Sequence, residues 1–343
     1  MNRFAAKDLA ERRIAISEAA QRLQLNPVIV EKDFWVCWML SLLFGRAEWN
    51  EAVVFKGGTA LSKVFRAIRR FSEDIDLSVS PVTLGISEQE INEATSRRRR
   101  DEWMDKLEKT CGKWVDEQLQ PELEREIKAV IGARAGGGSW LEYQVDAVTH
   151  SPVLLFHYPS TLQSQVPYIR PSVKLEFGSL TDQRPAGTHQ VTSWLAEQFP
   201  QLFSEPHCQV VALEIERVFW EKATILHAEY YRGLATPMPP NYSRHYSDVG
   251  AMAVSPQAES AIQNAGLRER VVDWKARFFP RGWARYDLAK PPTFRLLPPE
   301  ERLSELRRDY REMREMFLEP PVPLEKVFEK LSELEKRINL TGK

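Results

Sequence analysis

The sequence has few cysteines, no long apolar run and almost no net charge. Its three cysteines are far apart and odd in number, which argues against a disulfide framework or a zinc site and favours a reducing compartment. No apolar run reaches the length of a membrane span, and the charged N-terminus lacks the apolar region of a secretion signal. We therefore expect a cytoplasmic protein without a membrane segment.

The composition is that of an ordinary globular protein. Hydrophobic residues make up 43% and charged residues 28% of 343 residues, which is enough for one large domain or two. The formal net charge of -1 excludes a chain that binds nucleic acid through its overall charge. Binding of RNA would therefore depend on local basic patches.

The most informative stretch begins with a short strand and a Gly-Gly turn. Val53–Phe55 is predicted to be a strand, and Lys56, Gly57 and Gly58 follow it directly. A helix is expected from Thr59 to about residue 69. Backbone N–H groups at a glycine turn before a helix favour an anion.

A second strand is expected to carry Asp74 and Asp76. Side chains two apart on a strand point to the same face, so these carboxylates project together while Ile75 and Leu77 face the core. Two adjacent carboxylates repel each other unless a cation lies between them. Oxygen ligands of this kind suit Mg²⁺ that also holds substrate phosphates. The turn and the two acids together predict a site for a metal-bound nucleoside triphosphate.

The segments 56–61 and 71–77 resemble the nucleotidyltransferase signature of the AbiEii/AbiGii toxin family. Those proteins are the toxins of bacterial type IV toxin–antitoxin and phage-abortive systems. The resemblance extends to the helical segment 214–232, similar to a third family motif in which a lysine, here Lys222, contacts the nucleotide. Lys222 also lies within an apolar helix face, where a lysine needs carboxylates or an anion.

The segment 243–249 resembles a fourth motif with an essential aspartate, here Asp248. Family members commonly have Arg-Asp where this chain has Arg244 and His245, which puts any role of position 245 in doubt. Three of the six histidines, His207, His227 and His245, lie in this region, and since their spacing fits no metal motif we interpret them as core or surface residues.

Four polar residues around the two strands are further candidates for nucleotide binding. The hydroxyls of Thr59 and Ser62 either contact phosphate or cap the helix. Arg70 either meets the triphosphate or forms a surface salt bridge. Ser72 either contacts the nucleotide or is a site of modification by nucleotidyl or phosphoryl transfer.

Two further charged residues have open interpretations. Glu176, on a predicted strand 172–177, is either a third metal ligand or a structural partner of Lys174. Lys32 lies in a helix that begins at Pro27 and is largely apolar from Phe34 onward. We interpret Lys32 as a solvated charge at the helix start rather than a phosphate ligand.

The fold class predicted from these elements is α/β, a mixed sheet of the nucleotidyltransferase type with a largely α-helical C-terminal half. Residues 1–213 would form the nucleotidyltransferase domain with its N-terminal helices, and 214–343 a helical domain that completes the active site. Further strands are expected at 140–147, 153–158 and 208–214. Helices are expected over 5–24, 87–131, with a second helix beginning at Pro121, and in a C-terminal hairpin.

Two basic segments could contact RNA. Arg97–Arg100 is either an RNA contact or a solvated helix face, and the second interpretation is favoured. Residues 274–294 interleave aromatic and basic side chains, which suits a single-stranded RNA end. Packing of these aromatic rings on the core is the alternative.

The mechanism expected from the motifs is transfer of a nucleoside monophosphate. Asp74 and Asp76 would bind Mg²⁺, Lys56 and the glycine turn would hold phosphates, Lys222 would neutralise pyrophosphate, and Asp248 would act as a base or orient Lys222. The resemblance implies an RNA acceptor, the 3′ end of tRNA in some members, and a separately encoded winged-helix repressor as antitoxin. Transfer to a protein side chain and nucleotide binding without turnover are the alternatives.

Overall fold

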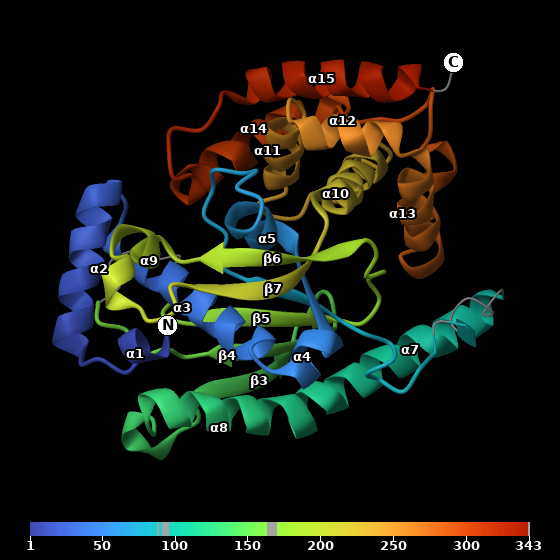
Figure 1. Ribbon diagram of the computed structural model, residues 1–343. Helices are drawn as coiled ribbons and strands as arrows, with labels where there is room; N and C mark the ends of the chain where they lie inside the picture. The colour runs from blue at the N-terminus through green and yellow to red at the C-terminus, as the bar shows by residue number, and fades with distance from the viewer. Residues whose placement is uncertain (88, 91–95, 163–169, 342–343) are drawn as a thin grey trace. The chain divides into compact units, whose positions relative to one another are not determined.

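A seven-stranded mixed sheet forms the centre of the first of two units of the chain. The structure is a computed structural model that describes residues 1–87, 89–90, 96–162 and 170–341. The unit comprises Met1–Val64 and Ser72–Leu213, and we call it the sheet unit (Figure 1). The strands are β1 Val53–Lys56, β2 Ile75–Val79, β3 Leu141–Val145, β4 Pro152–Phe156, β5 Val173–Gly178, β6 Ala186–Thr192 and β7 His207–Leu213.

The strand order is β3-β4-β5-β2-β1-β7-β6. Strand β2 pairs with β1 in the antiparallel and with β5 in the parallel direction, and β1 pairs with β7 in parallel. The outer pairs are antiparallel. This arrangement confirms the predicted mixed α/β sheet and places β1 and β2 at its centre, where both strands are covered by neighbours.

The helices of the sheet unit surround an apolar helix, α3. Asn26 caps this helix by accepting a hydrogen bond from the backbone N–H of Val28, with Pro27 in the first turn as predicted. Helix α3 contacts β5 and β7, and its Trp35 and Trp38 form an aromatic cluster with Phe156. The helices are α1 Asn2–Ala5, α2 Leu9–Leu23, α3 Pro27–Phe44, α4 Ala47–Ala52, α5 Gly57–Lys63, α7 Arg97–Lys113, α8 Gln120–Ile131 and α9 Trp194–Gln198.

The second unit is built of helices and is called the helical unit. It comprises Glu214–Lys343 together with Phe65–Phe71, a segment that the sequence analysis had placed with residues 1–213. The predicted helix after 214 and the C-terminal hairpin are confirmed, whereas α11 to α13 were not predicted individually. The helices are α10 Ile215–Tyr230, α11 Ser243–Met252, α12 Pro256–Gln263, α13 Ala265–Phe278, α14 Leu303–Glu312 and α15 Leu324–Leu340.

The predicted helix from Thr59 to about residue 69 is wrong at both ends. Helix α5 starts at Gly57 and ends at Lys63. Beyond it, the segment Phe65–Phe71 runs beside residues 316–318 of the helical unit, where Phe71 N–H donates to the Met316 carbonyl and Leu318 N–H donates to that of Arg69. These backbone bonds to a distant segment replace helical ones, which local sequence does not reveal.

Three other boundaries differ from the prediction. Strand β2 begins at Ile75, so Asp74 and Ser72 precede the strand instead of lying on it. The chain also continues from α7 through a π-helical turn, Trp114–Leu119, into α8, so Pro121 does not begin a separate helix. Residues 88 and 91–95 of the predicted helical stretch lie outside the described residues.

Strand β6 was not predicted because little of it is buried. Among its seven residues only Val191 is buried, so an apolar alternation is missing from the sequence. Among the described residues, every helix is too short or too polar to cross a bilayer.

Candidate active site

One row of charged side chains crosses three neighbouring strands. Lys56 on β1 is the register partner of Asp76 on β2, which is the partner of Glu176 on β5. Register partners in a pleated sheet point to the same face, so these three side chains lie together. Phe55 and Leu77 alternate with them and are fully buried. We call the charged side of these strands the acidic face.

Gly57 brings the backbone into contact with the Asp76 carboxylate. Its φ of +81° lies in the left-handed region, and a Cβ at this position would be 2.0 Å from Asp76 Oδ2. Only glycine avoids both the strain of the positive φ and the clash of a Cβ with the carboxylate. The glycine turn therefore lies directly against the carboxylate.

The Thr59 hydroxyl connects the turn to the acidic segment. Thr59 is fully buried, and its Oγ1 lies 2.5 Å from the Asp74 carbonyl oxygen and 3.0 Å from Ser72 Oγ. Its hydroxyl thus has protein partners and fixes the position of Asp74 relative to α5. Ser62 is half-buried on the same short helix.

The surroundings of Asp74 disfavour its ionised form. Burial, followed by the nearby charges of Asp76 and Glu73, raises the pKa of its carboxyl to about 6 against the opposing effects of Lys174 and Lys32. A carboxyl in this environment favours any cation that can bind it.

Glu176 is bound by its neighbours. It accepts a hydrogen bond from Lys174 Nζ at 2.8 Å and from Thr149 Oγ1 at 3.3 Å. Lys174 also donates to Asp146 at 3.0 Å. These contacts favour the structural interpretation of Glu176, the alternative to its role as a metal ligand.

A hard divalent cation fits the acidic face through two carboxylates. In the part of the chain that the structure describes, no group of three or more His, Cys, Asp or Glu side chains is arranged to hold a metal ion. Mg²⁺ commonly uses one or two carboxylates and completes its shell with water and substrate phosphates. Asp74 and Asp76 match that requirement without a third protein ligand.

A second group of charges lies inside the helical unit. Arg70 Nε and an Nη each lie 2.8 Å from an oxygen of Asp248, and Lys222 Nζ lies 2.9 Å from Asp248 Oδ2. All three side chains are at least nine-tenths buried. Although burial alone would raise it, these two cations hold the pKa of Asp248 well below its usual range. We call the three residues the buried triad.

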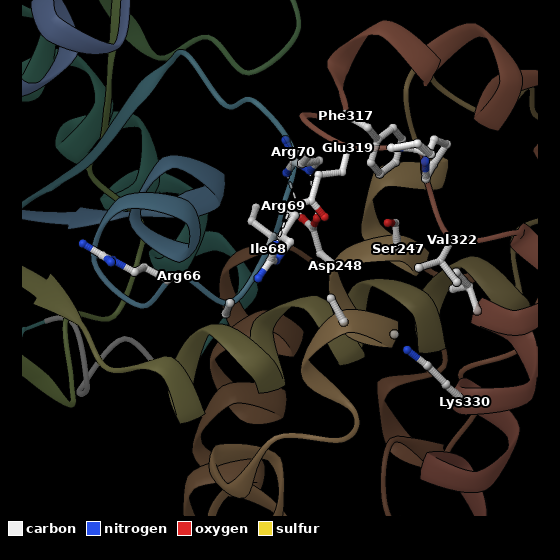
Figure 2. Close-up of a pocket in the computed structure, with 16 residues that line it drawn as sticks. Arg66, Ile68, Arg69, Arg70, Ser247, Asp248, Phe317, Glu319, Val322 and Lys330 are labelled. Carbon is white, nitrogen blue, oxygen red and sulfur yellow. Dashed lines mark hydrogen bonds and ion pairs between the residues drawn. The ribbon is translucent and has the colours of Figure 1, made fainter. Parts of the chain in front are cut away.

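The contacts of the buried triad bear on the alternative roles of Arg70 and Asp248 that the sequence left open. Arg70 does not form a surface salt bridge, because its partner is a buried carboxylate (Figure 2). Both oxygens of Asp248 contact cations, which favours the interpretation that it orients Lys222 over a role as a base. Burial lowers the pKa of the neighbouring His245 well below its ordinary value, so this imidazole stays neutral.

A cavity of about 280 Å³ opens beside the buried triad within the helical unit (Figure 2). Its walls combine apolar and cationic side chains. They include Arg66, Ile68, Arg69, Pro320, Val327 and Lys330. The cavity therefore gives solvent a route to the surroundings of Arg70 and Asp248.

The predicted RNA-binding segments have separate environments. In segment 274–294, Phe278 and Phe294 are buried, Trp274 lies against Phe278 and Trp283 lies under Arg232. Most of these rings therefore pack on protein. Arg98 on α7 is 90% exposed and pairs with Glu102 one turn away.

Sequence reasoning missed the environment of Lys32. This residue is buried rather than solvated, and its Nζ lies 2.6 Å from a carboxylate oxygen of Glu73, the neighbour of Asp74. A charged residue inside an apolar helix was the available signal, because a buried lysine needs a partner.

A glycine turn against paired carboxylates on a mixed sheet is an arrangement that suits a nucleotidyltransferase. The chain belongs to the AbiEii family, since residues 41–332 match the family described as nucleotidyl transferase AbiEii toxin, type IV toxin–antitoxin system. No curated protein matches the sequence. A solved structure that resembles it is MenT4, the nucleotidyltransferase toxin Rv2826c from Mycobacterium tuberculosis H37Rv. The match has 13% identity and a TM-score of 0.34, and it covers 87% of this chain and 98% of that one.

Proposed function

We propose that this toxin transfers a nucleoside monophosphate from a nucleoside triphosphate to an RNA acceptor, the 3′ end of a tRNA, in a Mg²⁺-dependent reaction in the bacterial cytoplasm. The observation that carries the proposal is the contact of Gly57 with the Asp76 carboxylate, in register with Lys56. This arrangement offers a cation site and a phosphate site side by side. In a toxin–antitoxin pair that defends against phage, the antitoxin would be a winged-helix repressor.

The reaction requires a negatively charged substrate to react with a hydroxyl. The 3′-hydroxyl oxygen bonds to the α-phosphorus, the bond from this phosphorus to pyrophosphate breaks, and the hydroxyl proton passes to water. Bound Mg²⁺ would neutralise phosphate charge and lower the pKa of the attacking hydroxyl. Asp74 and Asp76 would hold this ion, as the crowding of their carboxylates supports. Glu176, the register partner of Asp76, would remain bound to Lys174 and Thr149.

The remaining candidate residues have assigned roles in the proposal. Lys56 and the N–H groups of Gly57 and Gly58 would bind phosphate oxygens, with Ser62 beside them. Thr59 and Ser72 would fix the acidic segment, as their hydrogen bond supports.

The buried triad would contribute positive charge to the reaction. Lys222 would neutralise the leaving pyrophosphate, and Asp248 would hold Lys222 and Arg70 in place. The contacts of Asp248 favour this role over that of a base.

The test is incubation of purified protein with Mg²⁺ and each α-labelled nucleoside triphosphate, with or without total tRNA. We expect label on RNA, lost in Asp76→Ala and retained in Asp101→Ala, which removes an exposed carboxylate of α7. Label on protein instead of RNA would support transfer to a side chain. Nucleotide binding without any transfer would contradict the assignment of RNA as acceptor and support a binding module.

A further inference from the structure

Three consecutive charged residues of α3 are buried in the sheet unit. Glu31, Lys32 and Asp33 have relative exposures of 0%, 3% and 3%. A buried charge costs several kcal/mol unless it is paired and hydrogen-bonded. They precede the region 41–332 on which the family assignment rests. Their burial inside an apolar helix therefore needs an explanation of its own.

Each of the three charges has a different partner. Glu31 accepts hydrogen bonds from the N–H and hydroxyl of Thr161 at 2.7 and 2.8 Å. Lys32 Nζ lies 2.6 Å from a Glu73 carboxylate oxygen, and Asp33 lies 2.7 Å from Lys63 Nζ. Successive helix residues point about 100° apart, so one helix turn reaches three segments.

Two of these partners lie on the two segments that carry the proposed metal and phosphate residues. Glu73 directly precedes Asp74, and Lys63 is the last residue of α5, the helix that Gly57 begins. The Asp33 carboxylate also accepts the N–H of Trp194 at 2.7 Å. Adjacent residues of α3 thus hold the acidic segment and the glycine-turn helix.

We propose that Lys32 and Asp33 are positioning residues of the nucleotidyltransferase site. Lys32 fixes Asp74 through Glu73, and Asp33 fixes the glycine turn through Lys63. Apolar side chains would bury α3 at least as favourably, because replacing a buried ion pair with packed hydrophobic groups is often neutral or stabilising. An ion pair adds a defined distance between its two charged groups. The inference rests on the proposed function, since it concerns the same metal and phosphate sites.

The test removes each ion pair without changing net charge. Lys32→Met combined with Glu73→Gln deletes one cation and one anion, so the charge around Asp74 is nearly conserved. We expect the Mg²⁺ concentration for half-maximal transfer to rise and kcat to fall by about 10- to 100-fold, as for other residues that orient metal ligands. Asp33→Asn with Lys63→Met should instead raise the KM for the nucleoside triphosphate.

The matched control is Lys7→Met with Glu11→Gln, which removes an exposed ion pair of α2 in the same unit. Glu31→Gln tests the effect of removing a buried charge by itself, because the hydrogen bonds described for Glu31 reach Thr161 and neither Glu73 nor Lys63. Both should leave the Mg²⁺ and nucleotide dependence unchanged. A folded Lys32/Glu73 variant with wild-type kcat and Mg²⁺ dependence would overturn the proposal.

A second measurement does not depend on turnover. Thermal unfolding is followed with Mn²⁺ and each nucleoside triphosphate in turn, since a bound ligand raises the melting temperature. Wild type and both controls should be stabilised more than either ion-pair variant. Equal stabilisation of all proteins would refute the positioning role even if RNA labelling succeeds. Absence of RNA labelling with this difference preserved would refute only the RNA acceptor.

Discussion

The acidic face and the buried triad differ in how their charges are balanced. On the acidic face, Asp74 and Asp76 lie close together, and the raised pKa of Asp74 shows that nearby lysines do not compensate for burial and repulsion. In the buried triad, Asp248 has two cations within 2.9 Å. A carboxylate without enough compensating charge favours a cation as ligand, whereas a carboxylate compensated by cations of the protein stabilises the fold. Neutralising Asp248 should therefore lower the stability of the protein, whereas neutralising Asp74 should raise it and abolish activity.

The largest expected effect is on stability, from Asp248→Asn. Removing the only carboxylate of the triad leaves two buried cations on a neutral amide and should cost about 3–5 kcal/mol of unfolding free energy. Urea denaturation measures it. Glu319→Gln, which breaks the exposed pair with the adjacent Arg69, is the control and should change little. Wild-type stability of Asp248→Asn would mean that the triad does not support the fold.

The pH dependence of this contribution has a definite sign. Because the folded pKa of Asp248 is depressed, its stabilisation is fully present above the ordinary carboxyl pKa and is lost as pH falls through the folded value. Asp248→Asn should therefore flatten the acid side of the stability curve.

Asp74→Asn should have the opposite effect on stability. The folded pKa of about 6 lies above the ordinary 3.8, so ionised Asp74 destabilises the metal-free protein above pH 6. The shift corresponds to about 3 kcal/mol at pH 8, and to about half of that at pH 5. We expect the variant to be more stable by this order in EDTA, and inactive. Mg²⁺ should then stabilise wild type but not the variant.

Gly57→Ala tests the contact that carries the proposed function. The added Cβ would displace the Asp76 carboxylate, which lies 2.0 Å away, and should lower transfer by about 100-fold. Gly85→Ala is a matched control, since Gly85 also has positive φ but no atom within 4 Å of its Cβ position. If both variants lose the same activity, backbone strain and not the carboxylate contact is responsible.

The smallest effect is expected at Arg98. Its guanidinium is 90% exposed and pairs with Glu102 along α7, so Arg98→Gln should leave tRNA affinity within about twofold and the melting temperature unchanged. Filter binding at several salt concentrations measures the affinity. A salt slope reduced by about 0.7–0.9 would instead show that Arg98 contacts a phosphate.

Local sequence was sufficient for the centre of the site. The period-two alternation around Ile75 and Leu77 predicted which residues face the core, and the Gly-Gly sequence predicted a turn directly after the first strand. The helix end after Lys63 was predicted wrongly, because the segment Phe65–Phe71 bonds to residues 316–318. No propensity within the segment indicates a partner so distant in sequence.

The sequence by itself determined the kinds of elements, the acidic pair and the family signature, because these depend on spacing within a few residues. Tertiary structure alone decided which charges meet. Lys32 meets Glu73, Lys63 meets Asp33, and Arg70 shares Asp248 with Lys222. Each pair joins residues from separate segments of the chain. Because burying an unpaired charge is costly, each buried charge needs a partner, but local sequence does not specify which residue that partner is.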